Sequence, residues 1–111
     1  MRRVFFVAAS IIVLLFLSLD ARVYKGQKEY KKKCKECHDN GQELAYSKKK
    51  REWKKLMKSN GKLLAERHLK SAKAKKSHKY FKSKKFAKKS KHLRDFFVEY
   101  AKDSGNVPAC D

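Results

Sequence analysis

The chain has 111 residues, and its 31 Lys and Arg against 11 Asp and Glu give a formal net charge of +20. This length excludes an assembly of several ordinary domains, and a domain so small is only marginally stabilised by its own apolar burial. The charge indicates a negatively charged partner, such as an acidic protein, an anionic lipid surface or nucleic acid.

The N-terminus is predicted to be an export signal. Arg2 and Arg3 precede an uncharged, mostly apolar run of sixteen residues, 4–19, and a cleavage site follows Ala21. A membrane span needs about 20 such residues. We therefore expect residues 1–21 to be removed as a signal peptide, with retention of 4–19 as an inner-membrane anchor as the alternative. Residues 22–111 would then form a single domain in the periplasm.

The most informative segment is Cys34-Lys35-Glu36-Cys37-His38. The pattern C-x-x-C-H is the attachment signature of c-type haem. Two thiols three residues apart can form thioethers with the two vinyl groups of one porphyrin, and the histidine that follows can bind the iron through Nε2. We therefore expect one haem c, held by Cys34 and Cys37, with His38 as the proximal iron ligand. Because large apolar residues are scarce after Ala21, the haem would also supply missing core surface.

The rest of the chain predicts an all-α fold. A first helix is expected over residues 23–37, ended by Asp39-Asn40-Gly41, and a second helix is expected to be capped by Ser47 and stopped by Asn60-Gly61. A third helix begins near Lys62, and residues 77–90 are either a loop or a short helix. Ser90 is predicted to cap the final helix.

The middle of the chain is rich in lysine. Residues 48–91 hold 18 Lys and two Arg against two Glu, a local net charge of +18. Such density is typical of a solvated face, and it also attracts anionic partners.

Both ends of the mature domain resemble the class I cytochrome c family. Gly26, Tyr30 and Cys34, at four-residue spacing, are similar to that family's N-terminal helix, and Phe97 and Tyr100 are similar to its C-terminal helix. The resemblance implies that these two helices cross nearly at right angles beside the haem. The family's usual distal methionine, in a loop before the last helix, has no counterpart here.

Several residues compete for the sixth position on the iron. His68 lies in an apolar stripe of the third helix, where a buried imidazole needs a partner for its nitrogens, and iron would be one. It is the first choice as distal ligand. Met57 and His92 are the alternatives, His78 is expected to face water, and an open five-coordinate site also remains.

The predicted function is electron transfer, because no catalytic constellation accompanies the haem motif. The expected partner is an acidic redox protein or a membrane-bound electron-transfer complex, with an anionic membrane surface as a further possibility and no specific nucleic acid. Two alternatives stay open: a haem-based binder of small ligands, and a haem-free basic protein with a CxxC dithiol or zinc site. The third cysteine, Cys110, is either an unpaired tail residue or the link of a dimer.

Overall fold

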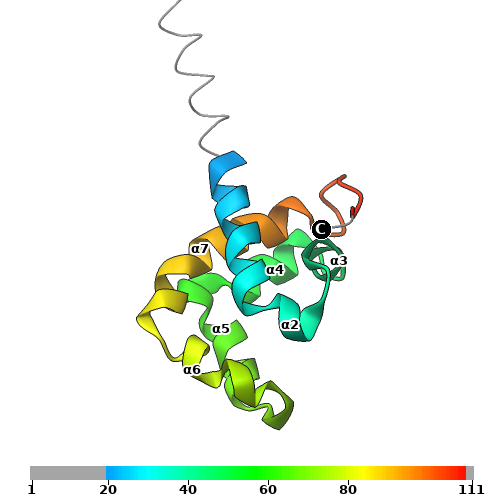
Figure 1. The fold of residues 1–111 in the computed structure, drawn as a ribbon. Helices are drawn as coiled ribbons and strands as arrows, with labels where there is room; N and C mark the ends of the chain where they lie inside the picture. The colour runs from blue at the N-terminus through cyan, green and yellow to red at the C-terminus, as the bar shows by residue number, and fades with distance from the viewer. Residues whose placement is uncertain (1–19, 110–111) are drawn as a thin grey trace, which may run out of the picture.

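The structure is a computed structural model that describes residues 20–109, and it is helical with no strand in that range (Figure 1). The predicted all-α class is therefore confirmed. Residues 20–33 form the first helix. The elements that follow are α2 (Lys35–His38), α3 (Gly41–Tyr46), α4 (Lys50–Leu56), α5 (Lys58–Leu69), the 3-10 helix η1 (Ala72–Ser77), α6 (His78–Phe81) and α7 (Lys84–Glu99).

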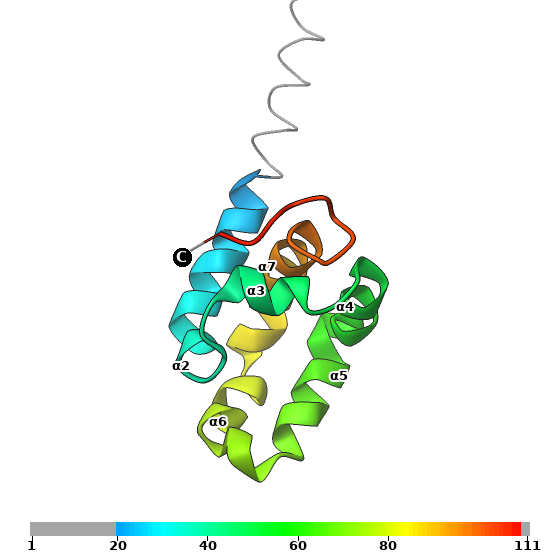
Figure 2. The ribbon, with the colours of Figure 1, turned by 90° about the vertical axis from the view of Figure 1, so that its right-hand side faces the viewer.

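Helix α7 is the centre of the fold. It packs against α3, α4, α5 and α6, and the helix of residues 20–33 lies against it in both ribbon views (Figures 1 and 2). Its side chains explain this position, because Phe86, Leu93, Phe96 and Phe97 are all buried along one face. The other helices of this small domain therefore bury their apolar side chains mainly against α7.

An aromatic cluster joins the two ends of the domain. Tyr30 lies with its ring centre 5.9 Å from that of Phe96 and 6.2 Å from that of Phe97. Trp53 stacks on Phe97 with ring centres 4.3 Å apart, and its indole N–H donates a hydrogen bond to the Ala45 carbonyl oxygen at 2.7 Å. Buried aromatic pairs contribute beyond their apolar area, so this cluster fixes residues 20–33, α4 and α7 together.

Gly26 allows the first helix to approach the backbone of α7. A Cβ at this position would lie 2.0 Å from the carbonyl oxygen of His92 and 2.7 Å from the Cβ of Phe96. No L side chain fits so close to another backbone, so the glycine permits direct contact of the two helices. Gly26 is one of the residues on which the resemblance to the class I cytochrome c family rests.

Substitution of Gly26 should therefore destabilise the domain strongly. We expect Gly26→Ala to lower the free energy of unfolding by about 1–3 kcal/mol, because the helices must separate to admit one methyl group. Chemical denaturation measures this change. The matched control is Lys28→Ala on the same helix, where Lys28 is exposed and alanine favours helix. Equal stability of Gly26→Ala and wild type would contradict the contact.

Three predicted helix boundaries are wrong. The first helix is not continuous over 23–37, because Cys34 forms a turn between residues 33 and 35. Ser47 ends α3, which was not predicted, and the N-cap of α4 is Lys49. Ser90 is buried inside α7, where its hydroxyl donates to the Ala87 carbonyl oxygen at 2.8 Å.

The true N-cap of α7 is Ser83, whose hydroxyl oxygen accepts a hydrogen bond from the Phe86 N–H at 3.2 Å. Phe86 lies two turns before Leu93 and is buried on the same side. The apolar face of the last helix therefore begins about two turns earlier than Leu93 suggests.

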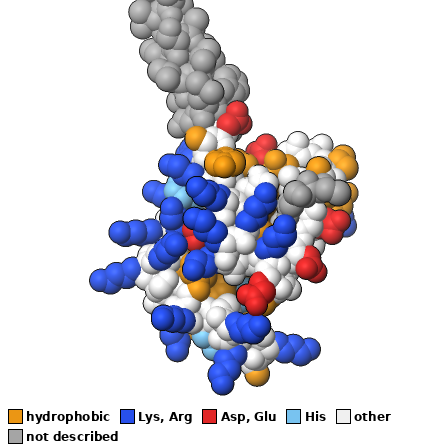
Figure 3. Space-filling view, viewed as in Figure 1, with side chains coloured by type: hydrophobic (Ala, Val, Ile, Leu, Met, Phe, Trp, Pro, Cys, Tyr) orange, Lys and Arg blue, Asp and Glu red, His pale blue; other side chains and the backbone are white. Residues whose placement is uncertain are grey.

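Basic side chains cover much of the surface shown in Figure 3. Lys and Arg gather over its left and lower parts, whereas the acidic side chains lie mainly toward the right. Only one ion pair occurs within residues 20–109, between Lys76 and Glu36 at 3.2 Å, and both side chains are exposed. Most of the positive charge is therefore unpaired at the surface of this part of the chain.

Two expectations concern residues that the structure does not describe. The signal peptide or anchor lies almost wholly before residue 20, and Cys110 follows residue 109. Across the described residues, no helix combines the length and the apolar character that crossing a membrane would need.

Candidate functional site

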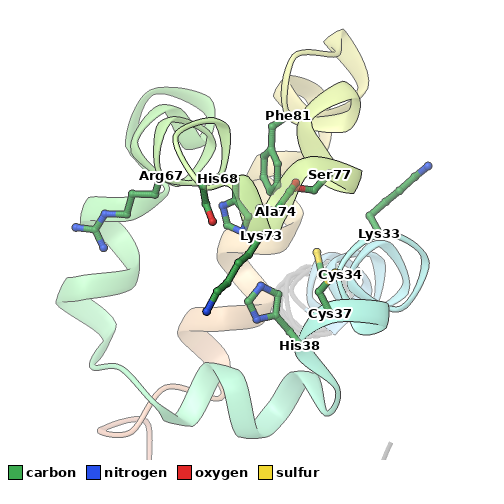
Figure 4. A pocket seen from close by; sticks show the side chains of 11 residues that line it. Lys33, Cys34, Cys37, His38, Arg67, His68, Lys73, Ala74, Ser77 and Phe81 are labelled. Atoms are coloured by element: carbon green, nitrogen blue, oxygen red, sulfur yellow. The ribbon is translucent and has the colours of Figure 1, made fainter.

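The motif residues line a cavity in the described part of the chain. It has a volume of about 430 Å³ and opens between α2 on one side and the end of α5, η1 and α6 on the other (Figure 4). Cys34, Cys37 and His38 contribute the first wall; Arg67, His68 and Phe81 contribute to the second. A volume of this size is typical of pockets for small molecules and cofactors.

A second cavity of about 190 Å³ adjoins the first and has several lining residues in common with it. Cys34, His38, His68 and Phe81 line it too, and it is bounded further in by Trp53, Leu56, Leu64 and Phe97. The site is thus open and basic at its mouth and apolar where it meets the aromatic core.

His38 and His68 face each other across the cavity (Figure 4). Their ring centres are 6.0 Å apart and their planes are inclined by 72°. The two imidazoles come from α2 and α5, thirty positions apart in the sequence. The sequence predicted both as iron ligands, and the structure brings them to one place.

The spacing of these imidazoles fits a metal ion between them. A bond from a metal to an imidazole nitrogen is about 2 Å long and the ring centre lies about 1 Å farther, so two imidazoles on opposite sides of one metal have centres roughly 6 Å apart. With Cys34 and Cys37 on the same cavity wall as His38, the donor set has the chemistry that a covalently attached haem requires.

The ring of His68 is oriented by two neighbours. Its Nδ1 lies 2.8 Å from the Leu64 carbonyl oxygen. Because a carbonyl can only accept, Nδ1 carries the proton and Nε2 keeps its lone pair in the neutral ring. The Phe81 ring stacks on His68 with centres 4.2 Å apart. A backbone carbonyl on the non-ligating nitrogen is the usual support of a metal-binding histidine.

The surroundings of His38 favour its neutral form. Partial burial against the cavity wall lowers its pKa below the ordinary value, the nearby His68 lowers it further, and Asp39 opposes them. A neutral imidazole is the form that binds a metal.

The loop after His38 is held by hydrogen bonds to the first helix and to the C-terminal tail. The Tyr30 hydroxyl donates to the Asp39 carbonyl oxygen at 2.9 Å. The Asn40 amide donates to the Ala109 carbonyl oxygen at 3.0 Å, and the Ala109 N–H donates to Gln42 Oε1 at 2.9 Å. The C-terminal tail therefore returns to α3 and closes over this loop (Figure 2).

The two motif cysteines differ in environment. Cys37 is exposed and Cys34 is half-buried. Burial, with smaller contributions from Glu29 and Cys37, raises the pKa of the Cys34 thiol to about 12. Redox-active C-x-x-C pairs instead depend on a lowered thiol pKa. Cys34 therefore has the properties of a packed thiol rather than those of a reactive thiolate.

Alkylation of Cys34 should follow this pKa. In haem-free protein with Cys37→Ala and Cys110→Ser, we expect the rate of reaction with iodoacetamide to keep rising from pH 7 to beyond pH 10, because the thiolate is the reacting form. Mass spectrometry over time gives the rate. A rate that is half-maximal near pH 8.5 and levels off by about pH 10 would show an ordinary exposed thiol. The variant that keeps only Cys37 provides the comparison with an exposed cysteine.

The other candidates for the sixth position do not line this cavity. Met57 is buried near Gly61, and a Cβ on that glycine would lie 3.5 Å from the methionine Cε. The backbone of His92 meets the first helix at Gly26. Its Nδ1 is buried with no hydrogen-bond partner. The Nε2–H of His78 donates to the Ser71 carbonyl oxygen at 3.0 Å.

Sequence reasoning missed several residues of the site. Phe81 lies in residues 77–90, for which the sequence predicts either a loop or a short helix, and its ring contacts that of Phe86 with centres 4.8 Å apart. The buried Glu29 was also missed, and it accepts a hydrogen bond from the Tyr80 hydroxyl at 3.2 Å. Burial first, and Glu29 next, raise the pKa of Tyr80, which keeps this phenol protonated. No local pattern signals such a pair, because fifty-one positions separate its members.

Within residues 20–109, no three His, Cys, Asp or Glu side chains gather as a metal-binding group. Comparison with known proteins finds no protein-family model, no curated protein and no solved structure that matches this chain.

Proposed function

We propose that this protein is a periplasmic electron carrier that holds one covalently attached c-type haem and passes single electrons between redox partners. The observation that carries the proposal is the cavity lined by both cysteines and the histidine of the C-x-x-C-H motif together with a second histidine, His68, whose ring centre lies 6.0 Å from that of His38. Apart from this motif, nothing in the chain is a known attachment signature.

Each residue of the site has a role in this proposal. Cys34 and Cys37 would form the two thioethers, and His38 and His68 would bind the iron from opposite sides. Leu64 and Phe81 would orient His68. The two terminal helices would cross beside the haem as in class I cytochromes c, which the close contact at Gly26 supports. When bound, the haem would supply the one-electron couple between ferric and ferrous iron.

The rest of the site controls access to this couple. The apolar inner wall and the stacked aromatic core would keep water from the inner part of the haem, and the basic residues Lys33, Arg67 and Lys73 lie where the cavity opens. Ligation by two histidines gives a lower reduction potential than ligation by histidine and methionine. We therefore expect a potential below that of a His/Met carrier.

The two rival functions have weaker support. A binder of small ligands needs an open position on the iron, whereas His68 stands opposite His38 at the spacing of a second ligand. A dithiol oxidoreductase needs a reactive thiolate, whereas burial raises the pKa of Cys34 to about 12.

Covalent attachment tests the proposal. Protein exported from a host with a c-type maturation system should keep its haem through acid–acetone extraction and on a denaturing gel. Cys34→Ala and Cys37→Ala should abolish or strongly reduce the haem that remains. The matched control is Cys110→Ser, which removes a cysteine outside the motif and should leave attachment unchanged. Complete loss of haem from the wild type on extraction would overturn the proposal.

A further inference from the structure

A further cavity lies away from the candidate haem site. Its volume is about 330 Å³, and it shares no lining residue with the two spaces beside His38. It opens between the end of α4, the turn that follows it and the middle of α7. Four basic residues line it: Lys54, Lys58, Lys91 and Arg94. The candidate electron carrier has no use for this cavity.

The charge around this cavity is uncompensated. No acidic residue lines it. The ion pair of Lys76 with Glu36 is the only one within the described residues, so none of the four basic side chains has a carboxylate partner there. Lys54 and Lys58 are four positions apart, and Lys91 and Arg94 are three apart on one face of α7. Like charges so placed repel each other, and a multivalent anion in the cavity would relieve that repulsion.

The turn at the edge of the cavity has an unusual backbone. Ser59, Asn60 and Gly61 lie within the bounds given for α5 but have left-handed φ values of 54°, 57° and 74°, so the helix is interrupted there. Non-glycine residues in this left-handed region are strained, and such strain is often found where proteins clamp ligands. A Cβ on Gly61 would lie 2.5 Å from Cζ of Phe86, so the turn is fixed closely against α7. It holds Ser59 and Asn60 at the cavity as hydrogen-bonding groups.

We propose that this cavity is a binding site for a phosphate-bearing anion with at least two negative charges. Arg94 suits two phosphate oxygens at once through its planar guanidinium group, and the three lysines supply compact charges. Ser59 and Asn60 add neutral donors at the edge. The site is independent of the haem, and its ligand comes either from solution or from the headgroup of an anionic lipid.

Calorimetric titration with pyrophosphate tests the proposal on the haem-loaded protein. At fixed physiological salt, the wild type should bind one pyrophosphate saturably. The variant with Lys54, Lys58, Lys91 and Arg94 all changed to Gln should bind at least tenfold more weakly. The matched control changes four exposed lysines elsewhere, Lys31, Lys75, Lys79 and Lys102, to Gln, removes the same charge, and should keep the affinity within about twofold. Circular dichroism checks that both variants are folded.

Vesicles distinguish the two sources of the phosphate. Phosphatidylcholine vesicles that contain cardiolipin, whose headgroup carries two phosphates, should bind the control better than the site variant if the ligand is a lipid headgroup. Equal binding of both variants, with the pyrophosphate difference retained, identifies a soluble phosphate. The proposal is overturned if pyrophosphate does not bind the wild type saturably, or if both variants lose the same affinity, because general attraction to a basic protein would then explain the binding.

Discussion

Replacing His68 with alanine should turn a six-coordinate, low-spin haem into a high-spin haem that binds carbon monoxide. His68 lines the cavity opposite His38 with ring centres 6.0 Å apart, and its Nδ1–H is already donated to the Leu64 carbonyl oxygen. Its Nε2 is therefore the nitrogen available to the iron. Removal of the ring opens the sixth position, and optical spectra of both oxidation states measure the change.

Three controls make this result specific. His78→Ala should leave the spectrum unchanged, because His78 lies outside the cavity and donates to the Ser71 carbonyl oxygen. The ferric wild type should also lack the weak far-red band of a methionine–iron bond. The assignment is wrong if Met57→Ala, rather than His68→Ala, opens the iron. Rapid binding of carbon monoxide by the wild type would favour a ligand binder instead.

Electron transfer with an anionic reagent should depend steeply on salt and on the lysines at the cavity mouth. Lys33 and Lys73 line the cavity, whereas Lys84 and Lys85 do not. Steering by such charges raises association rates by about 10–1,000-fold and is screened beyond about 10 Å at 0.1 M salt. We expect the rate with hexacyanoferrate to fall roughly tenfold or more between low and high salt.

The position of the charge should matter as well as its amount. The double variant Lys33→Glu, Lys73→Glu should slow the reaction more than Lys84→Glu, Lys85→Glu, although both change the net charge equally. Stopped-flow measurements at low salt separate the two, and unchanged haem spectra show that the sites are intact. Equal slowing would mean that only net charge acts. A rate that does not change with salt would mean that the lysines contribute to solubility and not to association with the reagent.

The sequence predicted the parts of the fold that depend on short-range patterns. The C-x-x-C-H motif, the apolar stripe of α5 and the aromatic face of α7 are all local, and the structure contains the corresponding helices. The contact at Gly26 was predicted through a resemblance, and the close approach to His92 agrees with it. The resemblance named Phe97 and Tyr100 on the last helix. In the structure Tyr30 packs on Phe96 and Phe97, and Tyr100 contacts Phe96.

Features that depend on tertiary packing could not be predicted from the sequence. His68, Met57 and His92 each lie in an apolar surrounding, so local pattern alone could not separate them. Only the tertiary arrangement, with α5 and α6 across the cavity from α2, places His68 at the cavity and the other two outside it. The N-cap of α7 was missed because two serines seven positions apart are equally good caps in sequence, and burial of Phe86 decides in favour of Ser83.

The pyridine haemochrome spectrum of the exported protein tests the central claim most directly. Pyridine displaces the axial ligands, so the band positions report only how the porphyrin is attached. If Cys34 and Cys37 hold the haem, the spectrum should be that of a haem with both vinyl groups saturated, at one haem per chain, and it should stay with the protein. A spectrum of haem with intact vinyl groups, or protein that carries no haem after export beside a working maturation system, would contradict the account.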